Sequence, residues 1–279
     1  MLSTCLISTR THTHTHRLPH MPTTNITATA NTTTAASPAR QRPIQNPESK
    51  IQNPIAPDLA IVLHGLNVTH HTMLRLARAL ERDGYRVVNR TYPSRTMPLD
   101  QIATEWLPRL LAGHDAPSAP RLHFVTHSMG GIIVRLWLQR NPVPKNLGRI
   151  VMITPPNQGS EIPDHFRNTP FMRSLFRRVA SPNAARLGTD ATSVPVQLSH
   201  TGLPPAVDLG IIAGNRPLNP LFLPWFKGES DGTVSVASTR LPGMRDHIIM
   251  PHSHTGILAR SATAAQVLHF LRNGKFHHA

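Results

Sequence analysis

The amino-acid sequence predicts an α/β domain built on a mostly parallel β-sheet, and two observations lead to this fold class. From residue 59 onward, short apolar runs typical of buried strands alternate with longer segments whose apolar residues recur at helical spacing. Strands that alternate with helices in this way form a parallel sheet with helices on both faces. The 279 residues, 39 % of them apolar, are enough for one such domain with a sizeable core.

Residues 1–57 have the composition of a disordered segment. They are rich in Thr, His, Asn, Pro and Ala, include an alternating Thr-His run at 11–16, and contain no acidic residue before Glu48. Such a segment cannot bury a core, so we predict a disordered tail, and we expect no specific metal site in its histidine run. The folded domain is predicted to span residues 58–275, with a short C-terminal tail at 276–279.

The expected strands and helices follow one another along the folded part. The apolar run at 59–63 indicates a central strand that ends at His64, and Gly84 fits the end of the helix that follows. Further strands are expected at 85–91, 122–125, 149–154, 209–213 and 247–250. Helices are expected at 72–83, at 98–111, between Ser128 and Asn141, and at 262–272. Because nothing before residue 59 resembles a strand, we predict a sheet of about six strands.

Residues 162–205 interrupt this alternation. Their first half mixes phenylalanines such as Phe166 and Phe171 with arginines such as Arg173, and their second half is a proline-rich connection. We expect a helical insertion over the active edge of the sheet. A basic amphipathic helix there is either a lid or a lipid-facing surface, and the alternative is ordinary packing against the core.

The net charge of +15 comes mostly from arginine and is spread along the chain. A nucleic-acid arm would have clustered basic residues interleaved with aromatic ones, so we expect no nucleic-acid partner. The overall field can still favour anionic substrates or transient contact with an acidic membrane surface. A solubilising surface is the simpler interpretation of the same charge.

Cysteine content and hydropathy bear on the compartment. Cys5 is the only cysteine, so no internal disulfide can form and the fold does not require an oxidising compartment. No run approaches the roughly 18 apolar residues of a spanning helix, and the residues after Met1 lack the apolar core of a secretory signal. We expect a cytoplasmic protein, with organelle targeting by the N-terminal segment as the alternative. The oligomeric state cannot be predicted from these features.

Ser128 stands on the predicted turn between the strand at 122–125 and the following helix. Gly130 and Gly131 let the helix backbone pass close to the strand, and the amino terminus of the helix favours negative charge developing beside the serine oxygen. A serine presented on such a turn has the geometry of a nucleophile. The alternative is an ordinary turn with glycine packing.

A serine nucleophile needs an acid that orients its base, and in this architecture the acid follows a later strand. Asp231 lies in a glycine-containing loop beyond the strand expected at 209–213, which makes it the preferred acid. Glu229 is its main competitor. For both residues, the alternative is a solvated acid on a turn.

The base is expected after the last strand, where His252 and His254 both lie. His254 comes immediately before the segment 255–258, where a loop histidine can point back at the sheet edge, so it is the preferred base. His252 is then expected near the site or on the surface. His247, inside the strand itself, is expected to be a packed histidine.

Acyl transfer also needs donors for the oxyanion, and backbone amides fixed before the reaction serve this purpose. Met129 supplies the amide after the nucleophile and Leu66 the second one, and we expect both side chains to shape the acyl pocket. His64, Gly65 and His127 are expected to border the substrate pocket. His127 is expected to point away from the serine and to have a structural role.

The motifs together resemble the α/β-hydrolase superfamily of lipases and esterases. They are His64-Gly65-Leu66, the run from Thr126 to Gly131, Asp231-Gly232 and Ser253-His254, in the order and spacing of that family. The run Thr154-Pro155-Pro156-Asn157-Gln158-Gly159 is similar to its compact bacterial branch. The resemblance covers about residues 58–275. One position departs from the pattern, because Thr126 replaces the first glycine of Gly-x-Ser-x-Gly and must crowd or slightly open the turn.

The resemblance implies a serine hydrolase that cleaves carboxylic esters, from small molecules or lipids, through an acyl-enzyme. Ser128 would be the nucleophile, His254 the base and Asp231 the orienting acid, and no cofactor or metal is expected. An acyltransferase or a thioesterase would use the same residues, so both stay open. A different class is a catalytically silent hydrolase fold that acts as a binding or membrane-surface protein.

Overall fold

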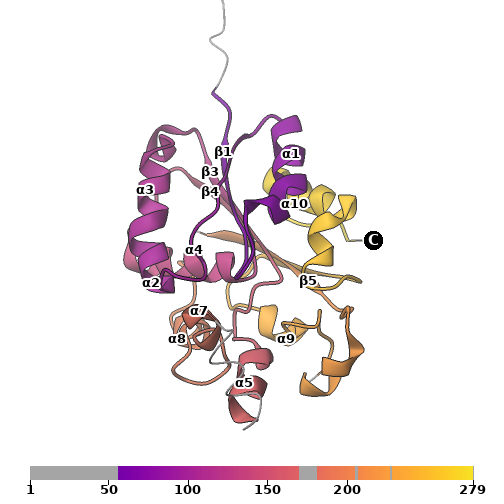
Figure 1. Ribbon diagram of the computed structural model, residues 1–279. Helices are drawn as coiled ribbons and strands as arrows, with labels where there is room; N and C mark the ends of the chain where they lie inside the picture. Colours follow the sequence, from indigo (N-terminus) through magenta and orange to yellow (C-terminus); the bar gives the residue numbers. More distant parts are fainter. Residues whose placement is uncertain (1–55, 170–180, 205–206, 227, 279) are drawn as a thin grey trace, which may run out of the picture. The chain divides into compact units, whose positions relative to one another are not determined.

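The structure is a computed structural model that describes residues 56–169, 181–204, 207–226 and 228–278 (Figure 1). These residues belong to one compact unit, Gln52–Ala279. The tail predicted at 1–57 lies almost entirely outside the described residues. The same holds for the most basic part of the predicted insertion, 170–180.

A parallel β-sheet of six strands occupies the centre of the unit, which confirms the predicted fold class. Its strand order is β2-β1-β3-β4-β5-β6, and every neighbouring pair runs parallel. The strands are β1 (Leu59–Leu63), β2 (Arg86–Asn89), β3 (Leu122–His127), β4 (Leu147–Ile153), β5 (Asp208–Gly214) and β6 (Asp246–Met250). Parallel strands bring all their carboxyl ends to one edge, where ligands of open α/β sheets bind.

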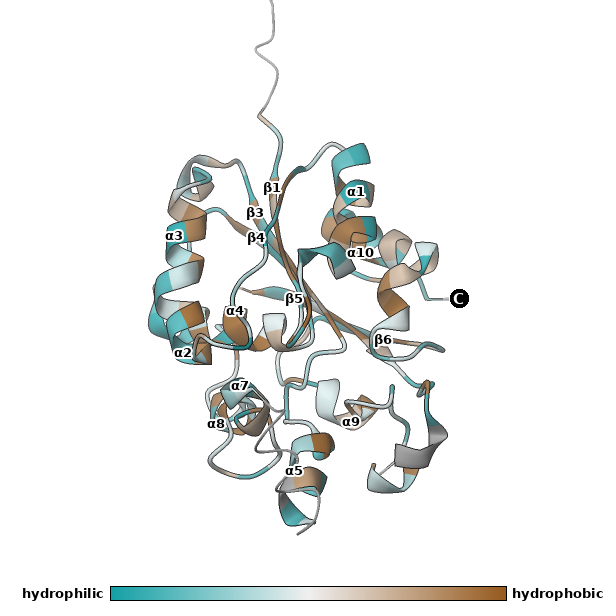
Figure 2. Cartoon of the chain, in the orientation of Figure 1, coloured by the Kyte–Doolittle hydropathy of each residue, from teal (hydrophilic) through white to brown (hydrophobic). Residues whose placement is uncertain are grey.

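Helices cover both faces of this sheet (Figure 1). One face carries α1 (Leu74–Arg82) and α10 (Ser261–Asn273), and the other carries α2 (Leu99–Gln101), α3 (Leu107–Ala112) and α4 (Met129–Arg140). Strand β1 is buried on both sides: Ile61 and Leu63 pack toward the second group, whereas Ala60 and Val62 pack toward the first. Figure 2 shows hydrophobic residues concentrated on the strands and on the helix faces that meet them.

The helix predicted at 98–111 is present but not uniform. Residues Ile102–Trp106 form a π-helical turn between α2 and α3. Pro108 follows this turn, and proline has no N–H to donate to the carbonyl four residues earlier. A wider turn accommodates that missing bond, so the apolar stripe predicted the helix while the proline set its irregularity.

Several short helices lie beyond the carboxyl ends of the strands, at the bottom of Figure 1. They are α5 (Glu161–Asn168), α7 (Pro182–Ala185), α8 (Val194–Ser199) and α9 (Val236–Thr239). Short 3-10 helices occur at His70–Met73, Ala116–Ser118, Pro220–Trp225 and Gly256–Ala259. The first three α-helices come from the segment predicted as an insertion, and its role as a lid stays a prediction.

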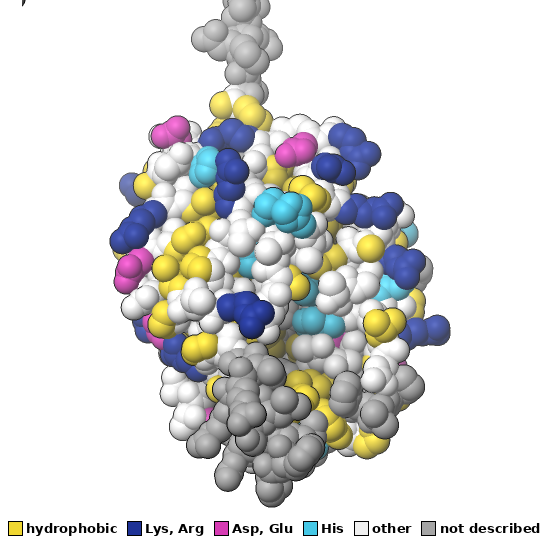
Figure 3. Space-filling view, in the orientation of Figure 1, with side chains coloured by type: hydrophobic (Ala, Val, Ile, Leu, Met, Phe, Trp, Pro, Cys, Tyr) yellow, Lys and Arg dark blue, Asp and Glu magenta, His cyan; other side chains and the backbone are white. Residues whose placement is uncertain are grey.

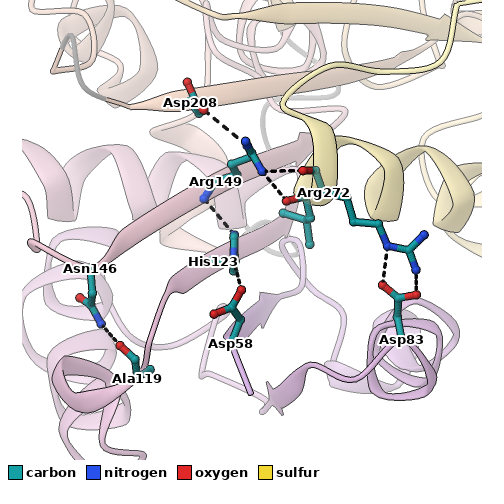
Figure 4. A network of polar contacts seen from close by, with 9 residues as sticks. Asp58, Asp83, Ala119, His123, Asn146, Arg149, Asp208 and Arg272 are labelled. Carbon is teal, nitrogen blue, oxygen red and sulfur yellow. Dashed lines mark hydrogen bonds and ion pairs between the residues drawn. The ribbon is translucent and has the colours of Figure 1, made fainter. Parts of the chain in front are cut away.

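Polar contacts connect the amino-terminal ends of the strands, at the edge of the sheet opposite their carboxyl ends (Figure 4). His123 Nδ1 accepts the N–H of Arg149 at 2.9 Å, and His123 Nε2 lies 3.5 Å from the carboxylate of Asp58. The Arg149 guanidinium donates to the carbonyl of Leu271 at 2.7 Å and lies 3.4 Å from Asp208. These contacts join the amino-terminal ends of four strands, β1, β3, β4 and β5, to the last turn of α10.

The chain remains packed at its C-terminal end. Phe276 is 2 % exposed, its ring lies 4.8 Å from that of Phe270, and its N–H donates to Asp246 at 2.7 Å. The core of the domain therefore includes Phe276. The boundary placed at residue 275 from the sequence stays a prediction.

Candidate active site

Ser128 occupies the sharp turn between β3 and α4. Its backbone has φ 53° and ψ −124°, a conformation that is unfavourable for any residue except glycine. The Ser128 N–H donates to the carbonyl of Ile153 at 2.9 Å, which fixes the turn to the end of β4. A Cβ at Gly130 would lie 2.8 Å from the carbonyl of Leu63, so only glycine lets α4 approach β1 this closely.

Thr126, the departure from the family pattern, lies inside the extended part of β3. It is in register with Leu63 on one side and Met152 on the other, and it is fully buried. The turn accommodates this β-branched residue because the sharp bend is made at Ser128, two residues later. Within the described part of the chain, the Thr126 hydroxyl has no hydrogen-bond partner.

His254 lies between Ser128 and Asp231, in the loop that follows β6. Its Nε2 is 3.0 Å from Ser128 Oγ, and its Nδ1 is 2.7 Å from Asp231 Oδ2. Because a carboxylate only accepts, Nδ1 carries the proton and Nε2 is free to accept the serine hydroxyl. The structure thus brings together the three residues predicted as nucleophile, base and acid.

Asp231 lies in the loop beyond β5, and its side chain is fully buried. Its second carboxylate oxygen accepts the N–H groups of Thr233 at 2.9 Å and Val234 at 2.8 Å. Three N–H groups therefore converge on this carboxylate. The competing acid, Glu229, is exposed and accepts a bond of 3.3 Å from the side chain of Asn215.

The other candidate histidines lie elsewhere. The backbone carbonyl of His252 accepts the N–H of Arg216, and the residue is only partly buried. His247 lies in β6 and forms a hydrogen bond of 3.0 Å with the hydroxyl of Thr239. Burial lowers the pKa of His247 to about 4, which keeps its ring neutral at physiological pH.

Two backbone amides lie close to Ser128. Met129 is the first residue of α4, so its N–H has no acceptor within the helix. Within the described residues the N–H of Leu66 makes no hydrogen bond either, and Leu66 lines the same cavity as Ser128.

The expectation for the Met129 side chain was wrong, because it is completely buried in the hydrophobic core instead of shaping the pocket.

The loop that carries Leu66 is fixed by His64 and Tyr92. His64 donates from Nδ1 to the carbonyl of Gly65 at 2.7 Å and accepts the Tyr92 N–H at Nε2. The Tyr92 hydroxyl donates to the His64 carbonyl at 2.5 Å, and the two rings stack with centroids 4.0 Å apart. Burial lowers the pKa of His64, so the ring is held neutral.

A cavity of about 430 Å³ opens at Ser128 and His254. Most of its wall is apolar, and the residues that form this part include Leu66, Pro156, Ile162, Phe166, Leu187 and Val234. No acidic residue, lysine or arginine lines it in the described part of the chain. His64, Gly65 and His127, which were expected to border the pocket, are not among the residues that line it. The His64 ring stacks on Tyr92, and His127 bonds to the backbone carbonyl of His254.

The segment similar to the compact bacterial branch forms the turn after β4. Arg135, on α4, donates to both the carbonyl and the side-chain oxygen of Asn157, and Asn157 donates to the carbonyl of Thr239 at 2.7 Å. Burial lowers the pKa of Arg135 to about 10. These bonds fix the turn that brings Pro156 to the cavity.

Some residues of the site were missed from the sequence. Asn67 has a φ of 60°, lines the cavity and donates its N–H to Ser94 Oγ at 3.2 Å. Thr233 and Val234 hold the Asp231 carboxylate. The sequence Asp231-Gly232-Thr233 could have predicted the role of Thr233, because an aspartate side chain commonly accepts the N–H of the residue two positions later in a turn.

The surface of the domain is basic. Figure 3 shows lysine and arginine side chains around the margins of the visible face, with few acidic ones among them. A wider hollow of about 990 Å³ lies beside α1 and is lined by Arg75, Arg78 and Arg82, but not by Ser128 or its partners.

In the part of the chain that the structure describes, no helix combines the length and apolarity needed to cross a membrane.

The sheet, its flanking helices and the serine turn after β3 define an α/β-hydrolase fold. Solved structures of bacterial lipases, esterases and phospholipases resemble it. Phospholipase PlaB from Legionella pneumophila matches with a TM-score of 0.62 and 19 % identity, over 78 % of this chain and 60 % of that one. Thus the match spans about three fifths of PlaB.

Two further structures match over most of their length. The mature form of Bacillus licheniformis lipase BlEst2 gives a TM-score of 0.60 at 20 % identity, covering 80 % of this chain and 93 % of that one. Staphylococcus hyicus lipase gives 0.51 at 14 %, covering 75 % and 91 %. No protein-family model matches the sequence, and no curated protein matches it. At these identities the likeness establishes the fold.

Proposed function

We propose that this protein is a serine hydrolase that cleaves carboxylic esters through an acyl-enzyme. One observation carries the proposal: a hydrogen-bonded series from Ser128 through His254 to the buried Asp231 opens onto a largely apolar cavity. A nucleophile, a base and an orienting acid in this geometry are what acyl transfer requires. Structural similarity to lipases, an esterase and phospholipases supports the same reaction class.

In the first half-reaction, Ser128 Oγ attacks the ester carbonyl while its proton passes to His254 Nε2. The amides of Leu66 and Met129 donate to the oxyanion of the tetrahedral intermediate. Asp231 stabilises the imidazolium and holds its Nδ1–H in place. His254 then protonates the leaving alcohol, and the acyl group stays on Ser128.

In the second half-reaction, His254 takes a proton from water as the water attacks the acyl-enzyme. The same two amides bind the second oxyanion, and His254 returns the proton to Ser128 as the acid leaves. Hydrolysis therefore needs no metal or cofactor in this scheme.

The cavity supports an ester with an uncharged, apolar acyl group. Burying apolar acyl surface against Phe166, Leu187 and Val234 is favourable, and no fixed charge in the described wall would pair with an ionic acyl chain. Both small-molecule and lipid esters fit this description. Contact with a membrane surface belongs to the lipid alternative only.

Labelling with a fluorophosphonate tests the nucleophile. We expect wild-type protein to be labelled at Ser128, and Ser128→Ala to be unlabelled with an unchanged circular-dichroism spectrum. Hydrolysis of p-nitrophenyl esters should fall by at least about 10⁴-fold in that variant. A folded wild-type protein that is neither labelled nor active on any chain length would contradict the proposal and favour a silent hydrolase fold.

The chain-length series also separates the substrate classes. Activation by micelles would indicate a lipase that acts at interfaces, and a preference for short soluble esters would indicate an esterase. Adding an alcohol acceptor or a thioester to the same assay reveals acyltransferase or thioesterase activity, which the same three residues can support.

A further inference from the structure

His127 lies directly behind the proposed active site, and hydrolysis as described above does not use it. The ring is 2 % exposed, and its Nε2–H donates to the backbone carbonyl of His254 at 3.0 Å. The two imidazole centroids are 4.8 Å apart. On its other side the ring meets the loop of Leu66, since a Cβ at Gly65 would lie 2.9 Å from His127 Nδ1.

We propose that His127 is a positioning residue that holds the His254 loop at a fixed distance from the oxyanion loop, with Ser128 between them. The inference rests on the proposed function and deepens it. His127 touches neither the cavity nor Ser128 Oγ, so it would act through the backbone of His254 and not on the substrate.

The backbone of His254 is held from two sides. Its N–H donates to the carbonyl of Asp231 at 3.1 Å, and its carbonyl accepts the proton of His127. The first bond ties the base to its acid, whereas the second ties it to the strand that carries the nucleophile. Losing the second bond would let the His254 ring move relative to Ser128, and a displacement of about 1 Å is enough to slow a reaction about 100-fold.

The hydrogen bond also fixes the form of His127. A carbonyl only accepts, so Nε2 carries the proton and Nδ1 does not. Nδ1 is buried with no hydrogen-bond partner in the described chain, so a second proton there would be an unsatisfied donor. Burial, and then the neighbouring His254 and His64 rings, lower the pKa of His127 to about 3. The ring is therefore a neutral donor at any pH where the reaction would be measured.

Glutamine and asparagine variants separate the donor from the bulk of the ring. The side-chain amide of His127→Gln can reach the position of Nε2 and donate to His254, whereas the amide of His127→Asn reaches only the position of Nδ1. We expect kcat for a p-nitrophenyl ester to fall about 10- to 100-fold in His127→Asn and His127→Leu, with KM changed less than about twofold. His127→Gln should recover most of the loss.

His123 provides a matched control, because it is a second buried histidine of the same strand at the opposite edge of the sheet. His123→Gln should lower the melting temperature without lowering kcat. Equal kcat in the Gln and Asn variants of His127, or losses that simply follow melting temperature across all four variants, would overturn the positioning role. The wild-type protein reports separately on the proposed function, since fluorophosphonate labelling of Ser128 does not depend on any His127 variant.

Discussion

At the residue scale, Asp231 combines a structural and a chemical task in one side chain. One carboxylate oxygen orders its own loop through Thr233 and Val234, and the other holds His254. An aspartate is suited to this because it only accepts, and all three of its partners donate.

Replacing Asp231 with asparagine tests whether one oxygen serves the loop and the other serves His254. The remaining oxygen can keep the two loop bonds, while the new NH₂ group faces His254 Nδ1 and favours the wrong tautomer. We expect an intact fold and a fall in kcat of about 10³- to 10⁴-fold, the scale of comparable substitutions in serine proteases. Steady-state kinetics with p-nitrophenyl esters would measure it. Glu229→Gln serves as the control, and a larger loss in that variant would reverse the assignment of the acid.

Thr126 invites a second residue-scale prediction. Its hydroxyl is buried without a hydrogen-bond partner in the described structure, and such a group costs about 1–3 kcal/mol. Thr126→Val keeps the β-branched shape and removes the polar atom. We expect the free energy of unfolding in urea to rise by about 1 kcal/mol with kcat unchanged. A loss of stability would show that the hydroxyl has a partner, for example an ordered water.

At the element scale, the edge of the sheet opposite Ser128 is joined to α10 by Arg149. Its guanidinium donates to the carbonyls of Leu271 and Arg272, in the last turn of the helix, where a cation is favourable. The side chain also lies beside Asp208. Arg149 of β4 therefore stabilises the C-terminal end of α10, a helix that comes much later in the sequence.

Removing this connection should weaken the fold and spare the chemistry. We expect Arg149→Leu to lose about 1–3 kcal/mol of unfolding free energy, because it leaves two helix carbonyls without their donor and removes one of the two arginines that bind Asp208. Arg245→Leu is the matched control, since Arg245 also binds Asp208 but is 53 % exposed and should cost less than about 1 kcal/mol. Urea unfolding measures both. A comparable loss in kcat for Arg149→Leu would indicate coupling across the sheet.

The elements themselves differ in how well the sequence predicts them. The strand expected at 59–63 was confirmed without change, because a strand buried on both faces is a continuous apolar run. The helix expected at 98–111 was confirmed only as a helix, since hydrophobic spacing does not report how Pro108 alters its hydrogen bonds. Asn67 was missed for a similar reason, because a loop residue has no periodicity.

At the scale of the whole molecule, the site depends on chain order. The nucleophile, acid and base follow three different strands, and parallel strands bring their carboxyl ends to one edge. This rule made Ser128, Asp231 and His254 predictable as neighbours. The cavity wall was not predictable, because Phe166 and Leu187 reach it from a segment without regular spacing, and only their packing decides which side chains face inward.

Buried histidines should make the stability of the molecule depend on pH. In the folded state the pKa of His127 is about 3 and that of His247 about 4, below the value of about 6.5 for an unfolded chain. Below pH 6.5 the unfolded chain therefore binds protons that the folded protein does not, and stability falls as the pH falls. The loss should run from pH 6.5 to about 4 for His247 and on to about 3 for His127, with about two protons taken up on unfolding near pH 5.

Guanidinium unfolding at several pH values between 7 and 4 would measure this uptake. His64 and His123, whose pKa values burial also lowers, should add to it in the same direction. His127→Gln should remove about one proton from the dependence. Stability that stays flat across this range would show that these rings are hydrated and able to ionise in the folded state.

The positive φ of Ser128 opposes catalytic activity to thermal stability at one position, because serine is needed for the reaction whereas glycine fits the backbone better. Glycine adopts φ 53° without strain, so Ser128→Gly should melt higher than Ser128→Ala, although neither can form an acyl-enzyme. A library of variants selected only for survival after heating should therefore accumulate glycine at position 128. The same library selected for turnover should retain serine there. Sequencing both selected pools would therefore show that position 128 keeps serine for the reaction and not for stability.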